Sequence, residues 1–290
     1  MTPDRDPFGR DRSERLTDHE TAERMLATGV RRVQDEGLRI SFDLLRFEEL
    51  IVEASVARSA VYRRWPTKHH YYADLLRRLA AHQFPAAAAY RDASVAFTQE
   101  NVDQVRASMA TQEGRRQAGI EICRVLAQRT FELLTSSPNW KVYLTLTATV
   151  ATLPTEGSLQ TDLRTSMREA EAEFFTEMAE IYEMFMTALG HRLRPDLPAG
   201  VSLQAVARIG LSILEGLSLH DITTPDATGS WRGNPFDAGE VTDWTPASIG
   251  FTSAMTSLFE IDPDQGGDWD DQMVEDRCQV LHEMTRKFRQ

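Results

Sequence analysis

Apolar positions recur at helical spacing along most of the chain, beginning shortly after Thr17. The first stripe has the i, i+3, i+4, i+7 pattern of an amphipathic helix and comprises Ala22, Met25, Leu26, Gly29, Val30 and Val33. The four residues from Thr17 to Glu20 match a capping box. In this motif the Thr17 hydroxyl and the Glu20 carboxylate each accept a hydrogen bond from a backbone N–H. Gly37 is expected to end this helix.

Three shorter helical patterns follow. The second helix is expected from Phe47 to about Ala54, and the third from about Arg58 to Trp65, where Pro66 stops it. A fourth is expected from Lys68 to about Ala81. After an alanine-rich turn near residues 84–89, further helices are expected at roughly 94–109, 114–136, 139–152, 158–189, 202–222, 246–260 and 269–288.

The segments between the helices indicate the fold class and the domains. A long loop is expected over residues 223–245, and no stretch shows convincing strand alternation or an internal repeat. Residues 1–16 alternate in charge and contain no apolar run, so they are expected to form a disordered leader. The pattern predicts an all-α chain with an N-terminal domain of three short helices followed by a longer one over 17–81, and a larger helical domain over 82–290.

Composition narrows the class of protein. Hydrophobic residues make up 41% of the 290 positions and charged residues 26%, which is ordinary for a globular protein. No apolar run reaches the roughly 18 residues that cross a bilayer, so no membrane partner is expected. Cys123 and Cys278 lie far apart and lack the spacing of metal ligands, which favours a reducing, cytoplasmic compartment.

Charge is distributed unevenly along the chain. The net charge is −12, yet residues 57–80 hold six basic side chains and one acidic one. Residues 81–290 hold 17 basic and 30 acidic side chains. Phosphate would repel the acidic part and attract the short basic segment. The distribution therefore suggests a nucleic-acid contact confined to one end, with a solvated charged face as the alternative.

The basic segment also carries a recognisable motif. Residues 58–68 read Arg-Ser-Ala-Val-Tyr-Arg-Arg-Trp-Pro-Thr-Lys, and with residues 47–57 they resemble the helix-turn-helix signature of TetR/AcrR-type transcriptional regulators. The resemblance spans roughly residues 20–80. Three positions depart from the family pattern: Ser55 stands where a turn glycine is common, Ala57 where a hydroxyl cap is common, and Arg46 where a small hydroxyl residue often begins the second helix. We therefore expect either a left-handed serine or a different turn at Ser55.

The resemblance implies that the third helix enters the major groove of DNA. Arginine can pair with guanine or clamp a phosphate, serine and tyrosine hydroxyls suit phosphate oxygens, and a lysine that opens the fourth helix can meet the backbone. Trp65 is expected in the core. The candidate DNA-binding residues are Arg46, Arg58, Ser59, Tyr62, Arg63 and Lys68. The alternative is an amphipathic helix end with exposed arginines.

The remaining helices are expected to bind an effector and a second subunit. The resemblance implies that two late helices, 202–222 and 246–260, pair with their counterparts in a homodimer. The small and apolar residues expected to form the contact on the first of these helices include Val206, Ile209, Gly210, Leu214 and Ser218. An apolar pocket for a small hydrophobic or aromatic effector is expected among Trp140, Tyr143, Phe174, Phe175, Met178 and Tyr182.

These observations lead to one leading hypothesis and two alternatives. The chain is expected to be a one-component transcriptional repressor that binds a pseudo-palindromic, double-stranded operator and is released by the effector. A helical protein–protein adaptor that has lost DNA binding is the first alternative. A helical enzyme is the second, although no nucleotide-binding, hydrolase or metalloprotease motif occurs. No cofactor or metal is expected, because neither the histidines nor the acidic cluster at 262–271 has ligand spacing.

Overall fold

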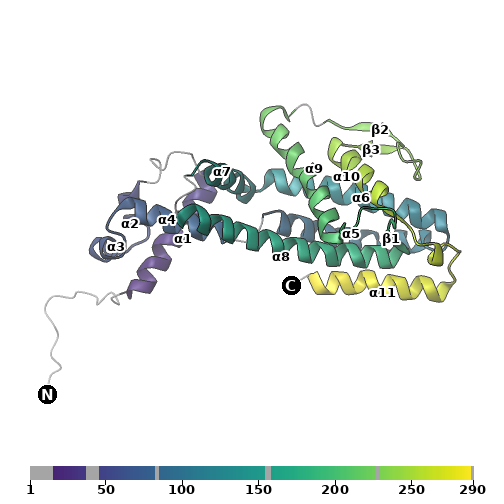
Figure 1. The fold of residues 1–290 in the computed structure, drawn as a ribbon, viewed down its shortest axis with the longest axis horizontal. Coiled ribbons are helices and arrows are strands. Elements are labelled where there is room, and N and C mark those ends of the chain that lie inside the picture. The colour runs from purple at the N-terminus through teal and green to yellow at the C-terminus, as the bar shows by residue number, and fades with distance from the viewer. Residues whose placement is uncertain (1–15, 37–45, 82–84, 154–157, 226–228, 289–290) are drawn as a thin grey trace, which may run out of the picture. The chain divides into compact units, whose positions relative to one another are not determined.

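The computed structural model describes residues 16–36, 46–81, 85–153, 158–225 and 229–288, and these residues form an all-α fold (Figure 1). The predicted leader over 1–16 lies outside the described residues apart from its last position, as do Gly37 and the connection up to residue 45. None of the described helices is both long and apolar enough to cross a membrane.

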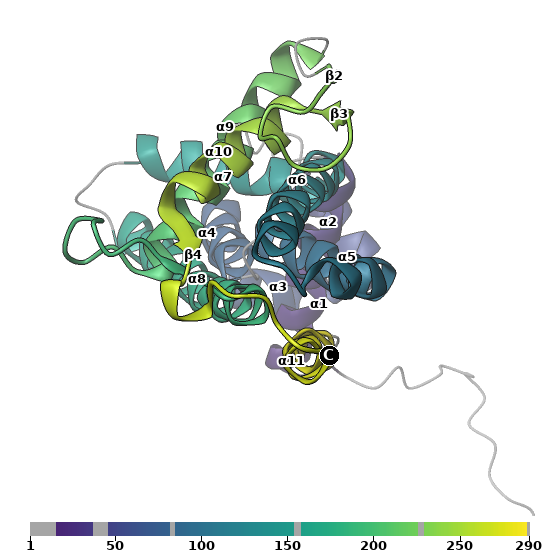
Figure 2. The ribbon, with the colours of Figure 1, turned by 90° about the vertical axis from the view of Figure 1, so that its right-hand side faces the viewer.

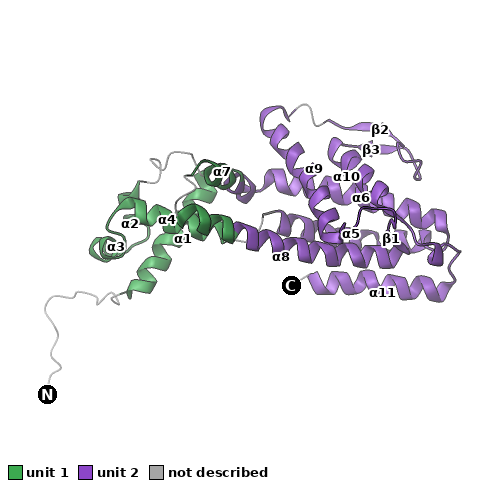
Figure 3. Ribbon diagram, viewed as in Figure 1, with its two compact units in different colours: residues 1–82, 144–166 green, residues 83–143, 167–290 purple. Residues whose placement is uncertain are grey.

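The described residues belong to two compact units (Figure 3). The first contains residues up to 82 together with 144–166, and the second contains 83–143 and 167–290. Helix α8 (Ser158–Leu189) begins in the first unit and continues into the second.

Four helices form the N-terminal part of the first unit: α1 (Asp18–Glu36), α2 (Phe47–Glu53), α3 (Arg58–Arg64) and α4 (Lys68–Ala80). Helix α1 packs against the other three, and four residues of its predicted apolar stripe are buried there (Met25, Gly29, Val30 and Val33), while Ala22 and Leu26 are half-buried. The Tyr71 hydroxyl donates to the Met25 carbonyl oxygen over 2.9 Å. This approach requires Gly29, since a Cβ atom there would lie 2.3 Å from the Tyr71 hydroxyl oxygen.

The capping interactions at the start of α1 and the turn between α2 and α3 agree with the predictions from the sequence. The Thr17 N–H donates to the Glu20 carboxylate and the Glu20 N–H donates to the Thr17 hydroxyl, which completes the predicted capping box. Ser55, in the turn between α2 and α3, has a φ of 53°, so the left-handed alternative is the correct one. Within the described chain, neither Arg46 before α2 nor Ala57 before α3 provides a side-chain cap.

The second unit contains α5 (Pro85–Ser108), α6 (Gln112–Ser136), α9 (Leu203–Thr223), α10 (Pro246–Leu258), α11 (Asp271–Phe288), the first residues of α7 (Pro138–Thr152) and most of α8. Helices α5, α6, α8 and α11 run roughly along one direction, while α9 and α10 lie across them (Figures 1 and 2). Helix α6 packs against α5, α9 and α10, and α11 packs against α5.

The all-α prediction is confirmed, and the structure adds two short strand pairs that the sequence pattern did not predict. Among the described residues, β1 (His191–Leu193) pairs antiparallel with β4 (Phe259–Ile261), and β2 (Trp231–Gly233) pairs with β3 (Thr242–Trp244). A strand of three residues is too short to show a period of two in its sequence. The second pair also gives structure to the segment that was expected to be a long loop.

The expected alanine-rich turn is wrong from Pro85 onwards, because α5 begins there. Alanine has the highest helix propensity, and proline is well suited to the first helical position, so this stretch starts a helix rather than interrupting one. Ala86, Ala87 and Ala89 are buried, which shows that their small side chains allow close packing.

A fully buried arginine holds the end of α5 and the start of α6 to the segment that follows β4. The Arg115 guanidinium donates to the carbonyl oxygens of Met109 (3.0 Å), Gln265 (2.8 Å) and Gly267 (2.8 Å). It also lies 3.9 Å from the centroid of the Trp269 ring. Because β4 directly precedes this segment, the arginine helps to position the β1–β4 pair beside α6.

The turn at Ser55 generates a stability prediction. Ser55→Gly is expected to raise the free energy of unfolding by about 0.5–1 kcal/mol, because the left-handed conformation strains an L side chain and does not strain glycine. Chemical denaturation followed by circular dichroism measures the change. Ala60→Gly, inside α3, is the matched control and is expected to lower stability by up to about 1 kcal/mol. A loss of stability in Ser55→Gly would contradict the strain argument.

Candidate functional site

The first candidate site is the exposed side of α3 and its surroundings. Val61 and Trp65 are buried and Ala60 is half-buried, whereas the other side chains of this segment are exposed. All the predicted DNA-binding residues are exposed in the first unit: Arg46 before α2, Arg58, Ser59, Tyr62 and Arg63 on α3, and Lys68 at the start of α4. The structure therefore places four of them on one short helix and the other two at the ends of its neighbours.

Acidic side chains accompany most of these candidates. Glu48 accepts a hydrogen bond from Tyr62 (2.6 Å) and pairs with Arg58 (3.0 Å). Glu49 pairs with Arg46 over 3.0 Å, and Asp18 pairs with Arg63. Exposed ion pairs of this kind contribute at most about 1 kcal/mol each, so a phosphate can replace the carboxylate at low cost. The hydrogen bond to Glu48 raises the pKa of Tyr62, which keeps its hydroxyl protonated and able to donate.

Trp65 holds α3 in place from beneath, as the sequence predicted. Its indole N–H donates to Asp74 over 2.9 Å, and its ring packs edge-on against Tyr71 with 5.1 Å between centroids. Asp74 also pairs with Arg77 over 3.0 Å. Asp74 also lies 3.6 Å from Arg64, so each of the three arginines of α3 has a carboxylate partner, and each of these pairs includes an exposed guanidinium.

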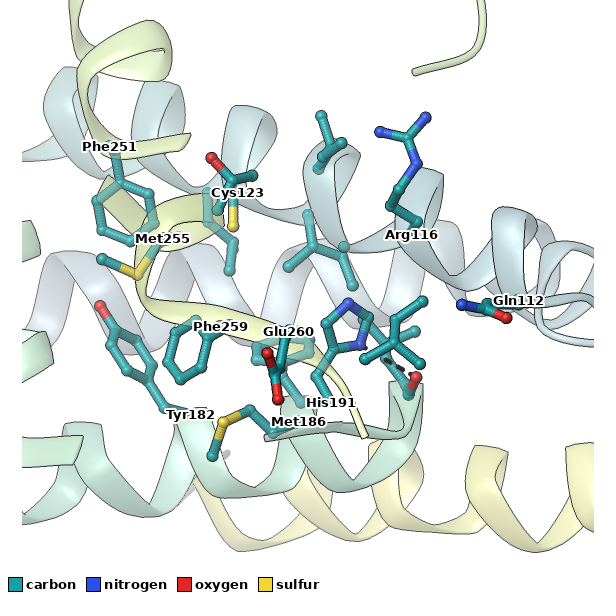
Figure 4. A pocket seen from close by; sticks show the side chains of 18 of the residues that line it. Gln112, Arg116, Cys123, Tyr182, Met186, His191, Phe251, Met255, Phe259 and Glu260 are labelled. Carbon is teal, nitrogen blue, oxygen red and sulfur yellow. Dashed lines mark hydrogen bonds between the residues drawn. The ribbon is translucent and has the colours of Figure 1, made fainter. Parts of the chain in front are cut away.

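The second candidate site is a cavity of about 450 Å³ within the second unit (Figure 4). Helices α5, α6, α8 and α10 and the β1–β4 pair all contribute to its wall. Most of the lining side chains are apolar: Ile120, Ile122, Leu126, Phe185, Met186, Leu189, Phe251, Met255, Phe259 and Ile261. Its volume and lining are typical of sites that bind small molecules.

A few polar groups interrupt this apolar wall. Burial raises the pKa of the Cys123 thiol to about 12 and raises the pKa values of both Tyr90 and Tyr182, whose hydroxyls hydrogen-bond to each other. Burial lowers the pKa of His191, whose Nδ1 lies 3.1 Å from the Leu189 carbonyl oxygen. At neutral pH these four side chains are uncharged.

The two charged side chains that line the cavity are both paired. Arg116 binds Glu113 over 2.6 Å and donates to the carbonyl oxygens of Phe236 and Asp237. Glu260 accepts from Arg192, its partner across the β1–β4 pair, over 2.8 Å. The cavity therefore combines an apolar body with neutral polar groups and neutralised charges.

The structure separates the predicted effector residues into two places. Of the described residues that line the cavity, Tyr182 is the one from the predicted set. Trp140 and Tyr143 stack on α7 with 5.7 Å between ring centroids, and Phe174 and Phe175 contact each other on α8. Met178 is buried on the same helix. Sequence reasoning missed His191, Phe259 and Glu260, because the pairing that brings β1 to β4 joins segments almost 70 residues apart.

A group of polar side chains lies beside those other predicted residues. Tyr143 donates to Glu171 over 2.6 Å, and Arg208 lies 3.5 Å from Glu171 and 4.1 Å from the centroid of the Phe175 ring. Burial, together with the nearby Glu171 carboxylate, raises the pKa of Glu215 to about 7 despite the opposing charge of Arg208.

Glu215 makes stability depend on pH in a defined direction. Its pKa is higher in the folded than in the unfolded chain, so its contribution to folding is lost as pH rises from about 4.5 to about 7. Glu215→Gln is expected to remove this dependence and to raise the free energy of unfolding above pH 7 by up to about 3 kcal/mol. Denaturation curves at several pH values measure it. Glu183→Gln, exposed on α8, is the control, and equal pH profiles for wild type and Glu215→Gln would contradict the prediction.

Comparison with known proteins provides little further information about these sites. No family model and no curated protein matches the chain. Among solved structures, the crystal structure of E. coli NemR in its reduced form is similar at 14% sequence identity, with a TM-score of 0.43 over 84% of this chain and all of that one. A function for this chain is therefore argued from its own residues.

Proposed function

We propose that the protein is a homodimeric transcriptional regulator, a one-component repressor that binds a pseudo-palindromic DNA operator and is released by a small apolar or aromatic effector. The observation that carries this proposal is the orientation of α3. Its buried residues anchor it to the first unit, and its exposed side carries Arg58, Ser59, Tyr62 and Arg63. A short, basic, outward-facing helix after a tight turn is the arrangement with which helix-turn-helix proteins read the major groove.

The proposal assigns a physical role to each exposed side chain. Arg58 and Ser59 occupy the N-terminal turn of α3, which is the part of a recognition helix that meets base edges. Tyr62 and Arg63 contact phosphate or bases after exchanging Glu48 and Asp18 for DNA. Lys68 and Arg46 bind the flanking backbone. The acidic remainder of the chain is repelled by DNA, which confines binding to this surface.

A dimer is required to read a two-fold operator, and α9 provides an exposed apolar surface for it. Ile209, Leu219 and Ile222 are each at least 44% exposed. Val206, Gly210, Leu214 and Ser218, which were expected at the dimer contact, are instead buried within the chain. At Gly210 a Cβ would lie 2.7 Å from the Phe251 ring of α10. We therefore assign the dimer contact to the outer side of α9.

Helix α8 provides a continuous path from the cavity to the first unit. Tyr182, Phe185 and Met186 line the cavity, while Asp162 near the start of the same helix pairs with Arg77 of α4 over 3.0 Å. An effector that favours one position of α8 would thereby favour one arrangement of the DNA-binding helices. Release follows if that arrangement does not fit both half-sites.

One observation favours the adaptor hypothesis: carboxylates form ion pairs with three arginines of the proposed DNA surface, Arg46, Arg58 and Arg63. A gel-shift assay at stated salt, with DNA from upstream of the protein's own gene, distinguishes the two functions. A retarded complex that resists nonspecific competitor DNA supports the regulator. Its absence at low salt supports the adaptor.

The DNA surface generates a prediction about affinity. Arg63→Ala and Lys68→Ala are each expected to abolish operator binding near physiological salt, because each removes a positive charge that binds DNA. Fluorescence anisotropy over a salt series measures the affinity, and the salt slope is expected to fall by about one for a lost phosphate contact. Arg106→Ala in the second unit is the matched control. Wild-type affinity in both variants would refute the assigned surface.

The dimer contact generates a second prediction. Leu219→Asp is expected to produce a monomer, because a carboxylate cannot be buried at an apolar contact without a partner. Sedimentation velocity measures the mass, and operator affinity is expected to fall together with dimerisation. Met273→Asp, which places the same charge at a partly exposed apolar position on α11, is expected to leave the mass unchanged. An unaltered dimer in Leu219→Asp would place the contact elsewhere.

A further inference from the structure

We infer that the cavity in the second unit binds an uncharged aromatic molecule bearing a hydroxyl or N–H group, and that Nε2 of His191 accepts the hydrogen bond from that group. The inference rests on the proposed function in taking this cavity as the effector site. It goes further by naming the chemistry of the effector and the atom that recognises it.

The hydrogen bond to Leu189 determines which nitrogen of His191 is available. A carbonyl oxygen can only accept, so Nδ1 carries the proton and donates to the Leu189 oxygen over 3.1 Å. Burial lowers the pKa of His191, so the ring is neutral near pH 7 and Nε2 carries a lone pair. Nε2 has no hydrogen-bond partner among the residues that the structure describes. It is therefore an acceptor, and it requires a donor from the ligand.

Gly119 of α6 leaves space in front of this nitrogen. A Cβ built at Gly119 would lie 3.7 Å from Nε2 of His191 and 3.7 Å from a methyl carbon of Leu189. Figure 4 shows the His191 ring between the strand that carries it and α6, with the labelled aromatic and methionine side chains on one side of it. A flat apolar ring fits among these side chains while its donor group reaches His191.

The charges around the cavity argue against an ionised ligand. Arg116 and Glu260 are already neutralised by Glu113 and Arg192. A carboxylate or an ammonium group entering the cavity would lose its hydration without gaining an unpaired counter-charge from the described lining. A neutral ligand carries no such cost.

Cys123 lines the same cavity but does not point to covalent capture. Its pKa of about 12 keeps the thiol protonated, and the thiolate is the form that attacks electrophiles. Reversible binding through apolar contacts and the hydrogen bond to His191 is the mode that this chemistry supports.

Three probes of one shape test the inference by calorimetry on the full-length protein: p-hydroxybiphenyl, p-methylbiphenyl and biphenyl p-carboxylate. We expect the hydroxyl compound to bind and the carboxylate to bind at least about tenfold more weakly. The ratio of hydroxyl to methyl affinity is expected to fall by about three- to tenfold in His191→Phe, which removes the acceptor. His191→Gln restores an acceptor and is expected to recover part of that preference.

Two variants at Gly119 locate the site. Gly119→Ala places a methyl group 3.7 Å from Nε2, where the ligand's donor group would lie, and is expected to weaken binding of the hydroxyl compound most, whereas Gly119→Leu extends into the cavity and is expected to abolish binding of every probe. Circular dichroism confirms that each variant is folded. An unchanged affinity ratio in His191→Phe, equal affinity for the carboxylate, or failure of all three probes to bind overturns the inference.

The same probes added to a gel-shift assay separate this inference from the proposed function. Binding with the expected pattern but without release of DNA upholds the ligand class and refutes effector-driven release. If a compound releases DNA but its affinity is the same in the His191 and Gly119 variants as in the wild type, the proposed regulator function is supported. The inferred hydrogen bond to His191 is then refuted.

Discussion

The fully buried guanidinium of Arg115 constrains the arrangement of the second unit. An arginine can be removed from water at tolerable cost only if hydrogen-bond acceptors replace the water, and three carbonyl oxygens accept from its two terminal nitrogens, whereas Nε has no partner in the described residues. Those carbonyls belong to the end of α5 and to the segment between β4 and α11. The requirement to satisfy one cation therefore brings together parts of the chain that are about 150 residues apart, and the cavity is built beside this junction.

The β1–β4 pair forms part of the cavity wall beside that junction. Arg192 and Glu260 face each other across the pair and neutralise each other. The neighbouring residues His191 and Ile261 also face each other, and both line the cavity. The β1–β4 pair thus neutralises Glu260 in the lining of the cavity, and it also places the neutral His191 ring there. The apolar side chains of α6 and α8 supply the rest of the surface.

In the first unit, burial of one side of α3 determines which of its charged side chains are exposed. Burial of Val61 and Trp65 turns the other side of α3 outward, and the outward residues are basic. The nearby carboxylates of Asp18 and Glu48 satisfy these arginines without burying them. A surface held by exposed ion pairs is organised yet remains able to exchange its partners for phosphate. Both units therefore pair their charged side chains: the ion pairs on α3 are exposed to solvent, and the pairs at the cavity leave Arg116 and Glu260 neutralised.

The sequence by itself determined most of the local structure. The helices, the capping box at Thr17, the left-handed turn as one of two alternatives at Ser55 and the buried role of Trp65 follow from spacing, propensity and side-chain chemistry within a few residues. Tertiary structure decided the cavity and the partners of its polar groups. Phe174 and Phe175 have the same apolar character as Phe185 and Phe259, so composition cannot tell which aromatic side chains pack in the core and which line a cavity. That choice depends on long-range contacts, because β1 and β4 are too short to be recognised from their sequences and become strands when the chain brings them together.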